Sequence, residues 1–358
     1  MALLDRSSEE YRVVAGLIRS AQRRVGATES QRWNGDIAVL SPLSRQRSRS
    51  DLDGTIHLHP RNVIGPLMRA QAGQGGRWWY PRAARDAAYN VIYEALRQSS
   101  KTAVDPPPAE PGKSLDSVLA PGARSLDMAL AEQRTYEITH AVMSDNGMAH
   151  AYSDDPPEAT AIAGHGLSAG AVTPFRLTPF STTTTAAARG FVDGVQAASG
   201  LDHEEVFDRL LTEAKGSRWS QAFKLVADQR HPGLLSELPA ERQMAVYRDV
   251  SRQAVREWSR ESSARRVTIS TVDAASEWGY AIGRDTADLV VGLAQDLDKP
   301  AAAEPTEEAS RSTAHREMSP SEIFGAQAPL TAVTRPSSTP TASPGTTGAE
   351  QQTPRIEK

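Results

Sequence analysis

The sequence predicts a mainly helical protein with a small β-sheet near its N-terminus and a disordered tail. Between residues 7 and 298 most segments repeat apolar residues every three or four positions, the spacing of amphipathic helices. Two short segments instead alternate apolar and polar residues, as half-buried strands do. From residue 299 onward Pro, Ser, Thr, Ala and Glu dominate, so this part cannot bury enough surface to offset its chain entropy.

The first region, residues 1–150, contains the predicted sheet. Its first helix is expected at 7–24, behind a Ser-Ser-Glu-Glu start that resembles a helix cap. The alternating segments at 36–40 and 54–59 predict two strands, separated by a loop that contains the basic run RQRSRS. Further helices are expected at 62–70, 81–98 and 125–143, and the proline-rich run 104–112 is expected to lie on the surface.

The second region, residues 151–298, is predicted to be helical after an irregular segment at 148–181 that is rich in Gly, Pro and Asp. Its helices are expected at 186–199, 202–215, 219–229, 240–260 and 273–297. The tail, 299–358, has one exception to its disordered composition. Residues 319–324 (SPSEIF) resemble a capped helical start with two large apolar residues, so they are a candidate docking segment for a partner or for the chain's own domain.

Composition excludes several classes of protein. The 358 residues include no cysteine, which excludes a disulfide scaffold, a thiolate zinc site and a cysteine nucleophile. A net charge of −4 gives no basic field, which argues against nucleic acid as a partner of the whole molecule. No apolar run reaches the roughly 18–20 residues that a membrane-spanning helix needs, and the first apolar run is too short for a signal peptide. We therefore expect a cytoplasmic protein.

Three segments carry a resemblance to a known family. A strand ends at residues 57–60 (HLHP), a helix contains 93–97 (YEALR), and a later helix contains 126–132 (LDMALAE). Their order resembles the zinc metallopeptidases of the gluzincin type, in which an edge strand lies above a helix with His-Glu-x-x-His and a later helix supplies a Glu as third ligand. The resemblance implies a zincin-like scaffold in the N-terminal region.

The resemblance also implies that the metal site is lost. Glu94 matches the general base and Glu132 the third ligand, but Tyr93 and Arg97 stand where the two histidines should be. Tyrosine is a poor zinc ligand at neutral pH, and a guanidinium keeps its proton and is never a ligand. Arg97 is instead expected to pair with Glu132 or Glu94 and so to fill the vacant metal position.

The chain is therefore expected to be a degenerate, non-catalytic member of that family, which binds a peptide or protein partner. No metal and no other cofactor is expected. If the chain binds zinc, Glu94 and Glu132 do not complete the coordination, and His57 or His59 are the candidates for the remaining ligands. A simpler interpretation treats Tyr93 as part of the core, with Glu94 and Arg97 as a solvated pair on the helix surface.

Two further functions compete with this interpretation. Residues 245–258 resemble a DNA-binding helix-turn-helix, although Asp249 occupies the turn position where glycine is usual and the apolar residues also fit one uninterrupted helix. The candidate DNA-contacting residues of this alternative are Ser251, Arg252, Gln253 and Arg256. The third possibility is an assembly or structural protein that is recruited through its tail.

Overall fold

The computed structural model describes residues 2–27, 33–73, 79–100, 113–117, 119–148, 179–263 and 272–298. The chain divides into two compact units, Met1–Pro300 and Ala301–Lys358, and every described residue belongs to the first. The predicted tail, its candidate docking segment 319–324 and the proline-rich run 104–112 lie outside the described residues. The predicted boundary near residue 150 lies outside them too, so the division into two regions stays a prediction.

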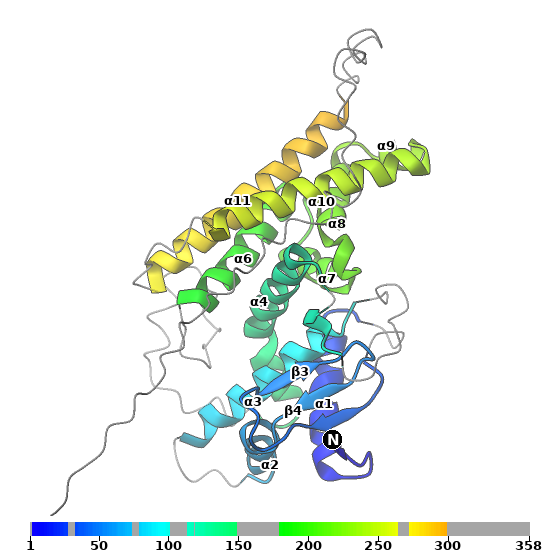
Figure 1. Cartoon of the computed structure of the whole chain (residues 1–358). Coiled ribbons are helices and arrows are strands. Elements are labelled where there is room, and N and C mark those ends of the chain that lie inside the picture. The colour runs from blue at the N-terminus through cyan, green and yellow to red at the C-terminus, as the bar shows by residue number, and fades with distance from the viewer. Residues whose placement is uncertain are drawn as a thin grey trace, which may run out of the picture. The chain divides into compact units, whose positions relative to one another are not determined.

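Helices make up most of the described residues, and one small sheet lies beside α3 (Figure 1). This confirms the prediction of a mainly helical chain with a small sheet near the N-terminus. The first half contains α1 (Glu9–Arg24), the π-helical turn η1 (Pro60–Ile64), α2 (Gly65–Gln71), α3 (Trp79–Arg97), the 3-10 turn η2 (Leu115–Ser117) and α4 (Pro121–Asp145). The second half contains α6 (Pro179–Ser199), α7 (His203–Thr212), the 3-10 turn η5 (Lys215–Ser217), α8 (Arg218–Arg230), α9 (Leu234–Glu237), α10 (Ala240–Ser263), α11 (Val272–Gln295) and the 3-10 turn η6 (Asp296–Asp298). In the described part, no helix has the length and apolarity to cross a membrane.

The sheet has four strands in the order β1-β2-β4-β3. Their bounds are β1 Ala2–Leu3, β2 Ile37–Val39, β3 Ser48–Ser50 and β4 Ile56–Leu58. The two predicted strands are β2 and β4, and they pair in parallel, whereas β1 and β3 are antiparallel edge strands. The sequence did not predict β3, because the basic run RQRSRS has a composition typical of a loop; its pairing with β4 overrides that preference.

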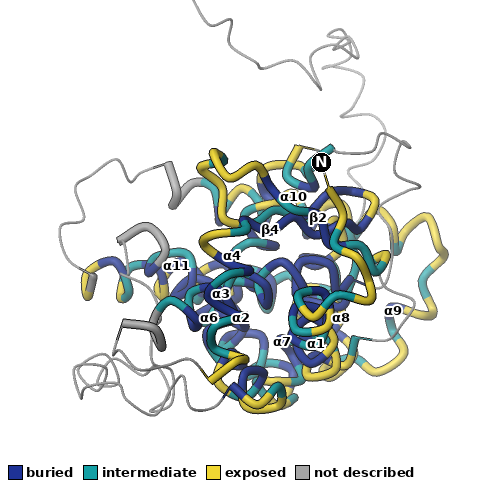
Figure 2. Tube along the Cα trace, turned by 90° about the horizontal axis from the view of Figure 1, so that it is seen from below, coloured by how far each residue is buried: buried dark blue, intermediate teal, exposed yellow. Residues whose placement is uncertain are grey.

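Helix α4 lies at the centre of the first unit. It packs against α1 and α3 on one side and against α6, α7 and α10 on the other. Its buried residues lie almost all around the helix, including polar ones such as Asp127, Gln133 and Arg134. Figure 2 shows α3 and α4 as largely buried stretches in the interior, with exposed residues towards the margins. A polar residue on α4 therefore has to find its partner inside the protein.

Helices α6 and α11 make the closest helix pair of the fold. Thr183 faces Gly279 and Ala187 faces Gly283, so the residue numbers rise together and the two helices run parallel. A Cβ atom at Gly283 would overlap the carbonyl oxygen of Ala187 and the amide nitrogen of Phe191. The approach of the two backbones therefore requires glycine at this position.

Substituting Gly283 with alanine is expected to lower the free energy of unfolding by about 1–3 kcal/mol, because the helices must move apart. The matched control is Gly292→Ala on the same helix, where the added Cβ meets open space; there alanine is expected to stabilise by roughly 0.5–1 kcal/mol through its helix propensity. Urea unfolding followed by tryptophan fluorescence measures both. Equal effects at the two glycines would contradict the close approach.

Candidate functional site

A fully buried carboxylate, that of Asp127 on α4, lies at the centre of an ionic cluster. Arg97 Nε at the end of α3 donates to Asp127 Oδ2 at 2.9 Å. Arg218 Nη1 at the start of α8 donates to Oδ1 at 2.6 Å, and Lys215 Nζ of η5 donates to the same oxygen. Each of the three cations is at most 3% exposed. One carboxylate therefore joins α3, α4, η5 and α8.

The charges of the cluster shift one another's pKa values. Burial opposes ionisation of Asp127, but Lys215, Arg218 and Arg97 outweigh it and hold the pKa of its carboxyl well below the usual range. Burial lowers the pKa of Lys215 to about 7, and the neighbouring charges of Arg218 and Arg97 act in the same direction. Asp127 opposes the shift of the Lys215 pKa, so Lys215 is partly charged at neutral pH, and the two arginines supply the permanent positive charge around Asp127.

Arg97 has a second partner, which is accessible to solvent. Its Nη2 donates to the carboxylate of Asp116 on η2, whose side chain is 43% exposed. The Arg97 guanidinium also lies over the Tyr93 ring, with Cζ 5.6 Å from the ring centroid. Arg97 was expected to pair with Glu132 or Glu94, and this was wrong: its ion pairs are with Asp127 and Asp116.

Glu94 is buried against the edge strand. Ser48 Oγ donates to its Oε1 at 2.9 Å and Ser50 Oγ to its Oε2 at 2.7 Å. Burial raises the pKa of Glu94, although Arg97 and the two hydroxyl groups oppose the shift. Because Glu94 and Arg97 are both almost completely buried, they are not a solvated surface pair, and that part of the simpler interpretation was wrong. Tyr93 does pack against the core, where it is partly buried.

Glu132, the residue matched to a third ligand, lies apart from the cluster. Its carboxyl makes no hydrogen bond or ion pair with the residues that the structure describes, and burial raises its pKa to about 7. Its charge, together with burial, raises the pKa values of the tyrosines at 89 and 136. Glu132 follows Asp127 by five residues on α4, which turns it to another side of the helix.

The two histidines of the HLHP segment have structural partners. His57 Nε2 lies 2.6 Å from Asp51 Oδ2, and both side chains are buried. His59 caps η1, since its Nδ1 accepts from the backbone N–H groups of Arg61 and Asn62, both at 3.2 Å. Within the described ranges, no three His, Cys, Asp or Glu side chains are placed to hold one metal ion.

The candidate DNA-contacting residues lie on one uninterrupted helix. Helix α10 runs from Ala240 to Ser263, so the turn expected at Asp249 is not formed. Ser251 Oγ lies 3.0 Å from Ser220 Oγ of α8, and Gln253 donates to the Asp249 carboxylate at 2.7 Å. Arg252 and Arg256 are exposed on this helix. The four candidate residues thus lie on a surface helix that packs against α8, and not on the second helix of a helix-turn-helix.

Sequence reasoning missed four residues of the cluster: Asp127, Asp116, Lys215 and Arg218. Asp127 offered a signal, because it interrupts an apolar stretch of its helix and a carboxylate there needs a charged partner. Lys215 and Arg218 offered none, since nothing in the sequence indicates which carboxylate they approach.

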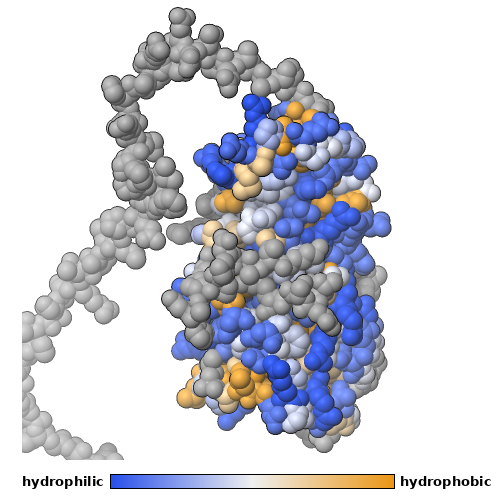
Figure 3. Space-filling view, turned by 90° about the vertical axis from the view of Figure 1, so that its right-hand side faces the viewer, coloured by the Kyte–Doolittle hydropathy of each residue, from blue (hydrophilic) through white to orange (hydrophobic). Residues whose placement is uncertain are grey.

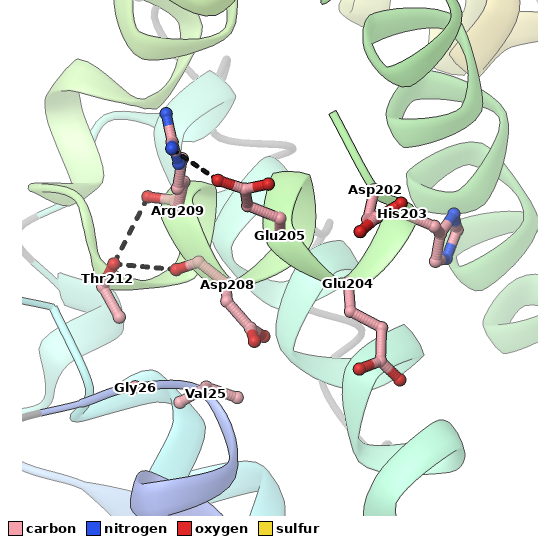
Figure 4. A pocket seen from close by; sticks show the side chains of 9 residues that line it. All are labelled: Val25, Gly26, Asp202, His203, Glu204, Glu205, Asp208, Arg209 and Thr212. Atoms are coloured by element: carbon pink, nitrogen blue, oxygen red, sulfur yellow. Dashed lines mark hydrogen bonds and ion pairs between the residues drawn. The ribbon is translucent and has the colours of Figure 1, made fainter. Parts of the chain in front are cut away.

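A separate cleft of about 640 Å³ lies beside α7 (Figure 4). It is lined by Val25, Gly26, Asp202, His203, Glu204, Glu205, Asp208, Arg209 and Thr212. His203 Nδ1 lies 3.1 Å from Asp193 Oδ1 and its Nε2 lies 3.5 Å from Glu137 Oε1. These carboxylates raise the pKa of His203 to about 9. None of the metal-site or DNA-contacting residues predicted from the sequence lines this cleft.

Neither a protein-family model, nor a curated protein, nor a solved structure matches this chain.

Removal of the central carboxylate is expected to be costly. Asp127→Asn leaves the buried guanidinium groups of Arg97 and Arg218 without their common anion and is expected to lower the free energy of unfolding by about 3–5 kcal/mol. Asp116→Asn is the matched control, because its half-exposed side chain is expected to contribute less than about 1 kcal/mol. Thermal and urea unfolding distinguish the two. Similar losses in both variants would show that Asp127 does not organise the cluster.

His203 is expected to make stability depend on pH. Its raised pKa means that the folded state binds the proton more tightly, so the stabilisation is complete below the unfolded pKa of 6.5 and is lost as pH rises through about 9. We expect His203→Gln to lose on the order of 1–2 kcal/mol at about pH 6 and almost nothing at about pH 10. Urea unfolding at several pH values measures the difference in the free energy of unfolding between the native chain and His203→Gln. The contributions of titrating groups that both proteins share cancel in this difference. A difference that does not change with pH would contradict the ion pairs.

Proposed function

We propose that this chain is a non-catalytic, zincin-like protein that acts by binding a peptide or protein partner. One observation carries the proposal: the second histidine position of the helix motif holds Arg97, whose buried guanidinium is ion-paired with Asp127 and Asp116. A fixed positive charge at that position opposes the binding of a metal cation.

The arrangement around Glu94 supports the same proposal. The resemblance matched its edge strand to residues 57–60, and this was wrong, because β4 is an inner strand that pairs with both β2 and β3. The edge strand that contacts α3 is β3. Ser48 and Ser50 of that strand donate to the two carboxylate oxygens of Glu94. A glutamate on α3 that is held by an edge strand supports the proposal, although the strand is β3 and not the one that the resemblance had matched.

The chemistry of these residues does not suit hydrolysis. Both oxygens of Glu94 already accept hydrogen bonds from serines, and the side chain is 2% exposed, so it is poorly placed to activate a water molecule. Burial raises the pKa of Tyr93 far above its usual value, so its hydroxyl stays protonated and is a weak ligand. The residues that remain are better suited to binding than to catalysis.

Neither competing function has comparable support. The DNA-binding alternative needs a turn at Asp249, where α10 is continuous. Recruitment through the tail depends on residues 319–324, which lie outside the described residues.

The proposal predicts that a zinc site can be rebuilt. Tyr93→His combined with Arg97→His is expected to bind about one zinc ion per chain, whereas the native chain binds none. The double variant is expected to fold, because Asp127 keeps Lys215 and Arg218 as partners. Elemental analysis after dialysis, together with a competitive metal titration, measures the stoichiometry. Because Glu132 lies on another side of α4 than Asp127, adding Glu132→Gln tests its match to the third ligand, and the expected result is at least tenfold weaker zinc binding.

The matched control is Tyr93→Phe with Arg97→Gln, which removes the same phenol and guanidinium but adds no imidazole. It is expected to remain free of zinc. Stoichiometric zinc in the native chain would overturn the non-catalytic assignment. A double histidine variant that folds but binds no zinc would remove the support for a zincin-like scaffold.

A further inference from the structure

We propose that Arg97 is the anchor for a carboxylate of the partner peptide, and that Asp116 occupies this anchor in the free protein. This inference rests on the proposed function, because it specifies the chemistry of the partner for the same site. The two carboxylates that pair with Arg97 differ in their exposure to solvent. Asp127 is completely buried, whereas the side chain of Asp116 is 43% exposed.

The unequal exposure makes one ion pair exchangeable and the other permanent. Breaking the pair with Asp127 would leave a charge in the protein interior, which costs several kcal/mol. Breaking the pair with Asp116 returns a half-exposed carboxylate to water, which costs little. A carboxylate from another molecule can therefore replace Asp116 on Arg97 at little net cost.

The charge of the cluster favours an anion at this place. Arg97 and Arg218 bring two permanent positive charges to the buried carboxylate of Asp127, and Lys215 is only partly charged at neutral pH, because burial lowers its pKa to about 7. Glu94 makes no ion pair with Arg97, whose ion pairs are with Asp127 and Asp116, although the charges of Glu94 and Arg97 act on each other. When Asp116 leaves, Arg97 needs another acceptor, and a guanidinium matches the planar shape of a carboxylate.

The exchange requires only a side-chain rotation. Leu115 is completely buried, and Ser114 forms a bridge to Asp51 beside the edge strand, so the backbone of this segment is fixed. The Asp116 side chain on the short turn η2 is 43% exposed, although its carboxylate accepts from Arg97. An incoming peptide would thus meet Arg97 next to the strand β3, whose Ser48 and Ser50 hold Glu94.

The described residues expose few large hydrophobic side chains, and these are scattered, which favours recognition of a partner by charge. Its exposed large hydrophobic side chains are Leu3, Leu43, Met244 and Tyr280, which belong to four separate segments. On the face shown in Figure 3, hydrophilic residues predominate and hydrophobic ones form small separate areas. A partner that docks through one charged group fits this surface better than one that needs a broad apolar patch.

The test compares three fluorescently labelled five-residue peptides by anisotropy on the full chain. The first has a central glutamate and an amidated C-terminus, the second has glutamine in its place, and the third is all alanine with a free C-terminal carboxylate. Asp116→Ala is expected to bind a carboxylate peptide about tenfold more tightly than the native chain does, and the glutamine peptide no better. Adding Arg97→Gln to Asp116→Ala is expected to abolish the gain.

Binding of the first peptide identifies an acidic side chain as the ligand, and binding of the third identifies a C-terminal carboxylate. Asp116→Asn, which keeps the side-chain size, serves as a second variant if Asp116→Ala does not fold. A folded variant that gains no affinity for either carboxylate peptide would overturn the inference. That failure is distinct from failure of the proposed function, because zinc binding by the double histidine variant does not depend on Asp116.

Discussion

The burial of the Asp127 carboxylate constrains the rest of the structure. An isolated carboxylate in the protein interior costs several kcal/mol, so its position demands cations. Three different elements supply them: Arg97 from α3, Lys215 from η5 and Arg218 from α8. Because each element contributes one cation to a common anion, none of them can shift without breaking an ion pair. Asp127 therefore fixes how the sheet-bearing half meets the helical half.

The same cluster explains why Asp116 remains near solvent. The two arginines carry more positive charge than the Asp127 carboxylate balances. Arg218 also donates from Nη2 to the carbonyl oxygen of Leu211 at 3.0 Å. Asp116 completes the coordination of Arg97 from outside. A fully buried second aspartate would add another desolvation penalty, whereas a half-exposed one balances charge and keeps contact with water.

Much of the helical framework could be predicted from the sequence, but the site could not. The helices followed from the spacing of apolar residues, and β2 and β4 from alternation. The strand β3 is only three residues long and polar, so its formation depends on pairing with β4 and on Glu94. Whether Arg97 meets Asp127 or Glu132 depends on the relative rotation of α3 and α4, which the pattern of apolar residues does not determine.

Under the proposed function, Arg97 stands where a zinc-binding histidine would be. The positive charge of the site then belongs to the Arg97 guanidinium and not to a bound zinc ion. A zinc ion polarises a carbonyl group or activates water, whereas a guanidinium forms reversible, charge-assisted hydrogen bonds with carboxylates. The pair with Asp127 fixes the guanidinium, and the pair with Asp116 leaves one side of it open to exchange. A scaffold that had lost hydrolysis in this way would still have a rigid cation beside its edge strand, which is what the recognition of an acidic peptide requires.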